Sequence, residues 1–436
     1  MKTKYYFLIV AILLPASGVS PRELTLEEVL KMAESHSYQI KASLAQREAF
    51  QNGLRAATSE RWPTLSVSGV ASYRDEVAQF EVVLPTGDVF RRDVGLKENY
   101  QADLRLNLPL FTGGRVGGGI DLARASSDYY GAVERATVDE VLLAARVAFM
   151  SLYRSDRLVE AARAGLKRAR IIAGDVQSLY DAGAADSVSL LDARFALIEA
   201  ESRLTNALSL RRQNEIRLLV LVGLDPTETI TLLFRPAPPE VNDLVPSSVS
   251  ESKPELAAAF SAVGMSRSLV KVSQAALWPS VSLFTGYSWG KPNLDQFHDE
   301  FNDYFTVGAV ASWVFNLGGK PVRNIAKARS RLSAAQFEFE KTREQLDRNA
   351  RIILENLKLA YENYQAASEN HRVTSEHYRL ATEKHREGAL SANRLIEIEA
   401  LLSQAEASLA STMAEFYVVQ SQYYHAVGSD LLKEGM

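Results

Sequence analysis

The chain has 436 residues, of which 47% are apolar and 23% carry a formal charge, and it contains no cysteine. The absence of cysteine excludes a disulfide framework and an acylated N-terminal cysteine. The formal net charge of −4 at pH 7 is mildly acidic, and no basic stripe opposes it, which argues against a nucleic-acid partner.

Residues 1–20 have the layout of a secretory signal peptide. Lys2 and Lys4 precede an apolar stretch from Tyr5 to Leu14, and Pro15 and small residues follow. A membrane anchor is the alternative, but the apolar stretch is too short to cross a bilayer. No later segment approaches the roughly 18 consecutive apolar residues of a transmembrane helix. An exported protein that still belongs to a membrane must then cross it with strands.

The remaining sequence is internally duplicated. Shifted by 205 positions, residues 100–225 align with residues 305–430 without a gap, and an upstream block repeats at a shift of 216. The 11-residue difference falls between the blocks, where we expect a longer loop in the first copy. We expect one fold built by duplication, with a first repeat at 21–225, an equatorial linker at 226–253 and a second repeat at 254–436.

After a short helix, each repeat continues with a long β-hairpin. Alternating apolar and polar residues predict hairpins at about 64–111 and about 280–316. The return strand of the first hairpin alternates from Tyr100 to Leu110, which is long for a soluble strand and suits a tilted membrane crossing. The edge of a soluble sandwich is the alternative, and it is disfavoured because only two long hairpins occur in an otherwise helical chain.

Repeated motifs mark the turns between strands and helices. Trp-Pro pairs precede the hairpins, and Gly-Gly pairs close the hairpins and open the long helices. The glycines at 117–119 invite comparison with a phosphate-binding loop, but neither the lysine spacing nor an acidic partner is evident, so we interpret them as hinges. The predicted turn residues are Trp62, Pro63, Gly113, Gly114, Trp278, Pro279, Gly318 and Gly319.

Long helices follow the hairpins. From Val138 to Tyr180 apolar residues recur every seven positions, which indicates a coiled-coil seam. At about 1.5 Å per residue each long helix measures roughly 100 Å. A glycine tip then reverses the chain into a shorter helix. The predicted helices are long ones at about 115–182 and 320–387 and return helices at about 184–222 and 389–427.

Four strands from one chain cannot close a barrel. Two chains would give about eight strands, whose interior is filled by side chains, whereas three would give about twelve, wide enough for water. The fold we expect is therefore mainly α with membrane β structure. It consists of a periplasmic α-barrel of long helices and a trimeric twelve-stranded transmembrane β-barrel, to which each chain contributes four strands. The function of such an open tube is conduction.

The sequence resembles the TolC-like outer-membrane efflux protein family over essentially the whole mature chain. The resemblance rests on the segment 24–30, on the paired Trp-Pro and Gly-Gly turns and on the paired tip glycines. It implies a homotrimeric channel in the bacterial outer membrane, in contact with its lipid and with a large periplasmic portion. It also implies docking on a periplasmic adaptor protein bound to an inner-membrane transporter, and an iris-like untwisting of the tip helices that opens the channel.

The resemblance also implies roles for tip residues. The adaptor contact of the family has a Val-Gly-Leu type tip, of which this chain keeps the two glycines and changes the flanks. The family's gate maps six and nine residues after the second tip glycine, onto Arg394 and Glu397. This pair either locks the closed state through inter-chain ion pairs or is a solvated pair that contributes little. The docking candidates are Ala182, Gly183, Ala184, Glu387, Gly388 and Ala389, and the secondary gate candidates are Asp186 and Asp192.

Two other classes of protein compete with a channel. An enzyme would need a catalytic set, but the six histidines form no HExxH motif and no cysteine completes a zinc site. We therefore expect no catalysis, no cofactor and no metal. A soluble periplasmic coiled-coil scaffold is the second alternative. For a channel, drug efflux, metal efflux and type I protein secretion all remain open.

Overall fold

The structure is a computed structural model, and it describes residues 22–239, 249, 251–296 and 298–432. The predicted signal peptide lies outside the described residues. The chain divides into two compact units. Each repeat contributes to both units, because the two long helices pass from one unit into the other. Unit 1 comprises Met1–Tyr38, Val138–Ser248 and Ala350–Met436, and unit 2 comprises Gln39–Thr137 and Val249–Asn349.

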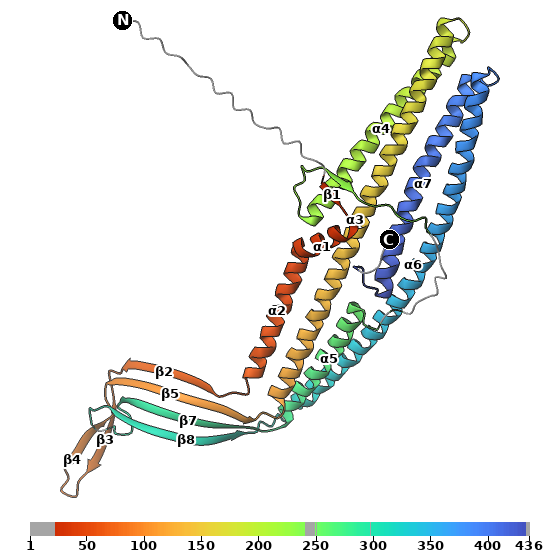
Figure 1. Cartoon of the computed structure of the whole chain (residues 1–436). Coiled ribbons are helices and arrows are strands. Elements are labelled where there is room, and N and C mark those ends of the chain that lie inside the picture. Colours follow the sequence, from red (N-terminus) through yellow and green to blue (C-terminus); the bar gives the residue numbers. More distant parts are fainter. Residues whose placement is uncertain (1–21, 240–248, 250, 297, 433–436) are drawn as a thin grey trace, which may run out of the picture. The chain divides into compact units, whose positions relative to one another are not determined.

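Unit 2 contains a four-stranded antiparallel sheet in the order β2-β5-β7-β8 (Figure 1). The two predicted hairpins are joined into this sheet by pairing of β5 with β7. The second hairpin is shorter than predicted, because its last strand ends at Ser312. The strands are β2 (Thr64–Tyr73), β5 (Glu98–Phe111), β7 (Ser280–Lys291) and β8 (Asn302–Ser312).

The extra residues of the first repeat form a hairpin of their own. Its strands, β3 (Ala78–Val83) and β4 (Val89–Val94), pair only with each other among the described strands. The connection is longer than that of the second repeat, as predicted, but its two strands were not predicted. Phe80 and Phe90 on these strands are about half exposed. The hairpin therefore has no buried apolar face that would give a pattern in the sequence.

The strand register gives the four-stranded sheet one apolar and one polar face. Val67 lies opposite Leu104, Leu104 opposite Tyr287, and Tyr287 opposite Phe305. Since side chains alternate along a strand, every second position adds another row to the same face. Val67 and Phe305 remain 78% and 69% exposed in the single chain. The neighbouring row on the opposite face consists of Ser66, Arg105, Gly286 and Thr306.

Four helical segments complete unit 2. Helix α5 begins at Pro254, whose fixed φ and missing N–H suit the first helical position. Lys271 at its far end reaches Asp121 of α3 (2.8 Å), and the rings of Phe50 and Tyr130 stack at 3.7 Å. The segments are α2 (Tyr38–Ser59), α5 (Pro254–Gln274, with a 3₁₀ turn at Ala275–Leu277) and the first parts of α3 (Arg115–Asp181) and α6 (Lys320–Arg386).

Unit 1 contains the rest of the long helices and both return helices. Figure 1 shows α4, α3, α7 and α6 following one another, and side-chain contacts agree with this order. Helix α4 spans Ser187–Val222 and α7 spans Ala392–Val427. The joining contacts are Asp156 to Arg211 (2.6 Å), Arg168 to Glu406 (2.7 Å) and the ring pair of Tyr361 and Phe416 (6.2 Å between centroids).

The coiled-coil seam predicted along α3 forms the core of unit 1. Ala145, Leu152 and Val159 are at most 4% exposed, and the intervening Ser155 is fully buried. Tyr180, near the tip, is 41% exposed and ends the seam. The heptad prediction is therefore confirmed over most of its length, and the mainly helical fold class with it.

The chain start and the linker pair in a small parallel sheet that the sequence analysis did not predict. Strand β1 (Arg22–Leu24) pairs with β6 (Ile230–Leu232). Helix α1 (Leu26–His36) follows at once, and its capping box joins Thr25 and Glu28. Strands of three residues carry too little alternation to detect. No helix in the described part of the chain is both long and apolar enough to cross a membrane.

Candidate functional site

The two helix tips of unit 1 share one backbone geometry. Gly183 and Gly388 have φ of +72° and +75°, which favours glycine. In the first tip the Ala184 N–H donates to the Leu179 carbonyl oxygen (2.8 Å), and the second tip has the equivalent bond at 2.9 Å. These are the long-range bonds of a Schellman motif, which satisfies the last carbonyls of a helix. The paired glycines therefore end both long helices by the same mechanism.

Each return helix begins three residues later than predicted, after a capping residue. The Asp186 carboxylate accepts a hydrogen bond from the Ser189 N–H (2.7 Å), and Ser391 accepts one from the Arg394 N–H (3.4 Å). The bond from the Ser189 N–H holds the pKa of Asp186 below its ordinary value. Asp186, a secondary gate candidate, therefore caps α4.

Asp192 joins the two repeats. The Asn393 amide of α7 donates to its carboxylate, with 3.0 Å between Nδ2 and Oδ2. The contact lies six residues beyond Asp186 and two residues beyond Ser391. This secondary gate candidate therefore joins the tip of the first repeat to the tip of the second repeat within one chain.

Arg394 and Glu397 form an ion pair within one turn of α7. Their Nη1 and Oε2 atoms are 2.5 Å apart, and the side chains are 53% and 62% exposed. Exposed pairs of this kind contribute little to stability. The pair that the resemblance implies is thus present within one chain, and an inter-chain lock remains a prediction.

An apolar layer lies beneath the tips. Val176 of α3 is fully buried, and Ala193 of α4 and Ile398 of α7 are nearly so. In contrast, all six docking candidates are exposed. The tips therefore present accessible loops on a packed base. The buried members of the layer are Ile172, Val176, Leu190, Ala193, Ala381, Leu395 and Ile398.

A buried ion-pair network that the sequence analysis missed fastens α3 to α7. Arg168 contacts Glu406 through both terminal nitrogens (3.0 and 2.7 Å) and Glu399 through Nε (3.2 Å). Ser403 accepts from Arg168 (3.1 Å) and donates to Glu399 (2.5 Å). Burial alone would lower the pKa of Arg168, but Glu406 and Glu399 outweigh it and raise the pKa. The spacing Glu-x-x-x-Ser-x-x-Glu on one helix face was the only signal in the sequence.

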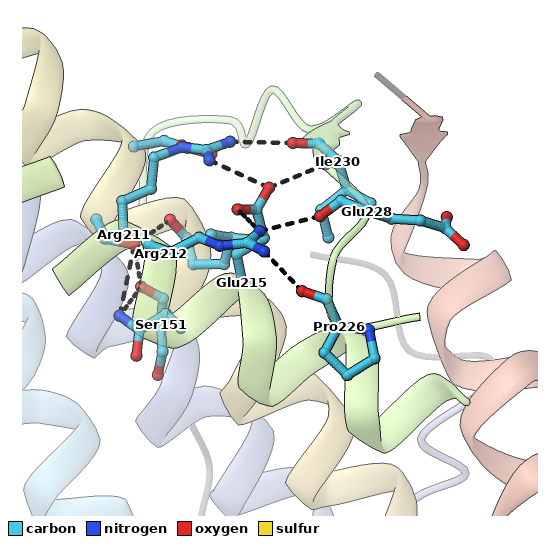
Figure 2. Close-up of polar contacts among 11 residues, drawn as sticks. Ser151, Arg211, Arg212, Glu215, Pro226, Glu228 and Ile230 are labelled. Atoms are coloured by element: carbon cyan, nitrogen blue, oxygen red, sulfur yellow. Dashed lines mark hydrogen bonds and ion pairs between the residues drawn. The ribbon is translucent and has the colours of Figure 1, made fainter. Parts of the chain in front are cut away.

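A second missed cluster holds the linker on α4 (Figure 2). The Glu215 carboxylate, 1% exposed, accepts from the Ile230 N–H (2.9 Å) and pairs with Arg211 (3.2 Å) and Arg212 (2.7 Å). Arg211 also donates to the Ile230 carbonyl oxygen (3.0 Å), and Arg212 to that of Glu228 (3.0 Å). Burial would raise the pKa of Glu215, but these bonds hold it below its ordinary value. Most partners are backbone groups, which no residue pattern reveals.

All the predicted turn residues lie in unit 2, and Gly113 lies against Trp278. Gly113 has φ of +63°, and a Cβ there would lie 2.7 Å from the Ala275 carbonyl oxygen and 2.8 Å from the Trp278 Cβ. Its counterpart Gly318 has a less crowded site, where the nearest atom would be 3.4 Å away, on Asn316. The following glycines, Gly114 and Gly319, have φ of +91° and +70°. The Trp-Pro pairs lie just before β2 and β7, and Trp62 and Trp278 are 71% and 61% exposed.

Solved structures of channel proteins share this fold. The chain matches CusC with a TM-score of 0.79 at 14% identity, over 93% of this chain and 92% of that one. VceC of Vibrio cholerae matches at 0.77 and 16% identity, over 93% and 96%. The open state of MtrE from Neisseria gonorrhoeae matches at 0.78 and 17%, over 93% and 89%. The paired hairpins and long helices are therefore the fold of these outer-membrane channels.

The sequence gives the family. A family model described as outer membrane efflux protein matches residues 29–224 and 245–428. A comparison with curated proteins finds no match. The chain belongs to the outer membrane efflux protein family, which confirms the resemblance drawn from the paired turns and tips. It is an efflux channel of the outer membrane and not an enzyme.

Proposed function

We propose that three copies of the chain form the exit duct of a tripartite efflux or type I secretion system. A periplasmic adaptor and an inner-membrane transporter pass small molecules or proteins to the duct, which conducts them passively across the outer membrane. Family membership supports the efflux role. Two sets of open edges in the single chain support the trimer.

The first set is the pair of outer strands in the four-stranded sheet. β2 and β8 each pair on one side only in that sheet. Pairing of β2 with β8 of a neighbouring copy would close three sheets into a barrel of about twelve strands and leave no edge. The apolar rows through Val67 and Phe305 would then face lipid.

The second set lies on the helices and carries the proposal. Within the chain, α3 of the first repeat packs against α7 of the second. The duplication makes α6 equivalent to α3 and α4 equivalent to α7, so the same interface can form between α6 of one copy and α4 of the next. Both helices expose apolar residues at coiled-coil spacing. On α4 these are Val188, Leu191, Phe195 and Ile198, and on α6 Ile352, Leu359, Val373 and Leu380, each at least 44% exposed.

The tips are the proposed gate and docking surface. Arg394 and Glu397 are exposed on one turn of α7, so each side chain is free to exchange its intrachain partner for one on a neighbouring copy. Asp192 acts beside them through Asn393. The adaptor binds the exposed loops around Gly183 and Gly388, where the chain reverses with fixed geometry.

Native mass spectrometry and planar bilayers test the proposal together. Detergent-solubilised protein is expected to have three times the chain mass and to conduct ions in single-channel recordings. Phe195→Glu places a charge in the dry seam and should yield monomers, whereas Phe195→Leu should keep the trimer. Monomeric wild-type protein without conductance would overturn the proposal.

A further inference from the structure

The Arg168 network lies beside two apolar clusters of unit 1. On the tip side, Ile172 and Val176 belong to the apolar layer beneath the tips. Leu166 and Ala169, which flank Arg168 in the sequence, pack with Ala200. The Arg168, Glu399 and Glu406 side chains are only 15%, 4% and 19% exposed. Breaking such a pair leaves a buried charge without compensation, so the network resists separation of α3 from α7.

Helices α3 and α7 approach each other closely at the network. A Cβ at Gly165, one turn before Arg168, would lie 2.6 Å from the Ser403 Oγ and 3.4 Å from a Glu399 oxygen. Arg168 also lies 5.7 Å from the ring centre of Tyr378 on α6. Three helices from both repeats therefore meet at one level of the unit.

The network has no counterpart at the equivalent interface. The 205-residue shift places Val373 at the position of Arg168 and Arg194 at that of Glu399. Ile198 takes the position of Ser403. Glu201 takes the position of Glu406, so the α6 and α4 edges keep charged residues at the two glutamate positions but lack the central arginine and the serine. The arginine-centred network is therefore specific to the interface between α3 and α7.

We propose that the Arg168 network is a fixed joint between the two repeats. When the tips open, α3 and α7 stay together at this level, and only the segment between the joint and the tips moves apart. Arg168 lies 15 residues before Gly183, which places the joint about 22 Å from the tip at 1.5 Å per residue. The inference rests on the proposed channel, since it concerns how far that channel opens.

Reversible cross-links at two levels test the joint. The chain has no native cysteine, so introduced pairs react alone. Gly165→Cys with Ser403→Cys places two sulfurs within disulfide reach at the joint. Asp192→Cys with Asn393→Cys, joined by a short bis-methanethiosulfonate reagent, links the repeats at the tips. Dithiothreitol reverses both links, and the single variant Ser403→Cys controls for the hydrogen bonds that Ser403 makes with Arg168 and Glu399.

Single-channel conductance in planar bilayers is the measurement. The joint predicts that the disulfide at 165 and 403 leaves the open conductance unchanged from that of the reduced protein. The link at 192 and 393 should reduce it several-fold. Equal loss in both linked proteins would show that the repeats part at Arg168, and no loss in either would show that they part nowhere. Both results overturn the joint, whereas absence of conductance in the unmodified protein overturns the channel itself.

Discussion

The Asn393 amide donates to the Asp192 carboxylate across 3.0 Å, and the two residues come from different copies of the duplicated sequence. The contact joins α4 to α7 within two turns of the tips. About two turns further along α7, Glu399 pairs with Arg168 of α3, and this largely buried network joins the same two repeats. In the tip half of unit 1 the chain thus joins its repeats with an exposed hydrogen bond at Asn393 and with a largely buried ion-pair network at Arg168.

Replacing Arg168 should destabilise the protein strongly. Arg168→Met leaves Glu399 and Glu406 without their cation, and breaking a buried pair costs about 3–5 kcal/mol. Arg170→Met is the matched control, because its pair with Glu201 is 60% and 52% exposed and contributes at most about 1 kcal/mol. Thermal unfolding followed by circular dichroism in detergent compares the two. Equal melting temperatures would show that the Arg168 network contributes no more than a surface pair.

The two glycines of the first Gly-Gly turn should differ in their tolerance of a methyl group. Gly113→Ala meets both a positive φ and the Ala275 carbonyl oxygen, so we expect a loss of more than about 2 kcal/mol. Gly114→Ala has a positive φ but open space, and backbone strain alone costs about 1 kcal/mol. Denaturant unfolding of the two variants should rank Gly113→Ala as the less stable. The opposite order would exclude crowding against Ala275 as the cause.

Acid should loosen the first tip before the second. The pKa of Asp186 is depressed by the Ser189 N–H, so its ionised form stabilises the α4 terminus. This contribution is present above the ordinary carboxyl value of 3.8 and is lost as pH falls through the lower folded value. The protection of the Val188 and Ser189 amides against hydrogen exchange, relative to the intrinsic rate at the same pH, should therefore fall at low pH. Asp186→Asn keeps a capping side chain without a charge, so it should remove this dependence on pH. The second tip is capped by the uncharged Ser391 and should show no such dependence.

Removing the proposed gate pair should raise conductance. Arg394→Ala combined with Glu397→Ala deletes three copies of an ion pair from the tips of a trimer, so the closed channel should leak more in planar bilayers. Melting temperature should stay within a few degrees, because the pair is exposed and contributes about 0–1 kcal/mol. An unchanged closed conductance would remove both residues from the gate.

The sequence predicted what depends on periodicity and on glycine. The glycines that flank α3 located its observed end to within one residue, heptads identified its seam, and alternation located β2 and β5. What it missed depends on contacts between distant segments. The Arg168 network joins positions more than 200 residues apart, and the linker cluster binds backbone groups around Ile230. The return helices begin three residues later than predicted, because several polar residues near each tip could cap the helix and the sequence does not show that Asp186 and Ser391 do so.

The pairing of β1 with β6 constrains the order of folding. Arg22 lies opposite Ile230, so the first described strand has no partner until more than half of the chain has been made. Closing a loop of this length is entropically costly and slow compared with helix formation. Helix α1 also depends on a later part of the chain, because the ring of His36 packs against Gly223 at the end of α4. The first repeat must therefore be complete before β1 and α1 can take their places in the fold.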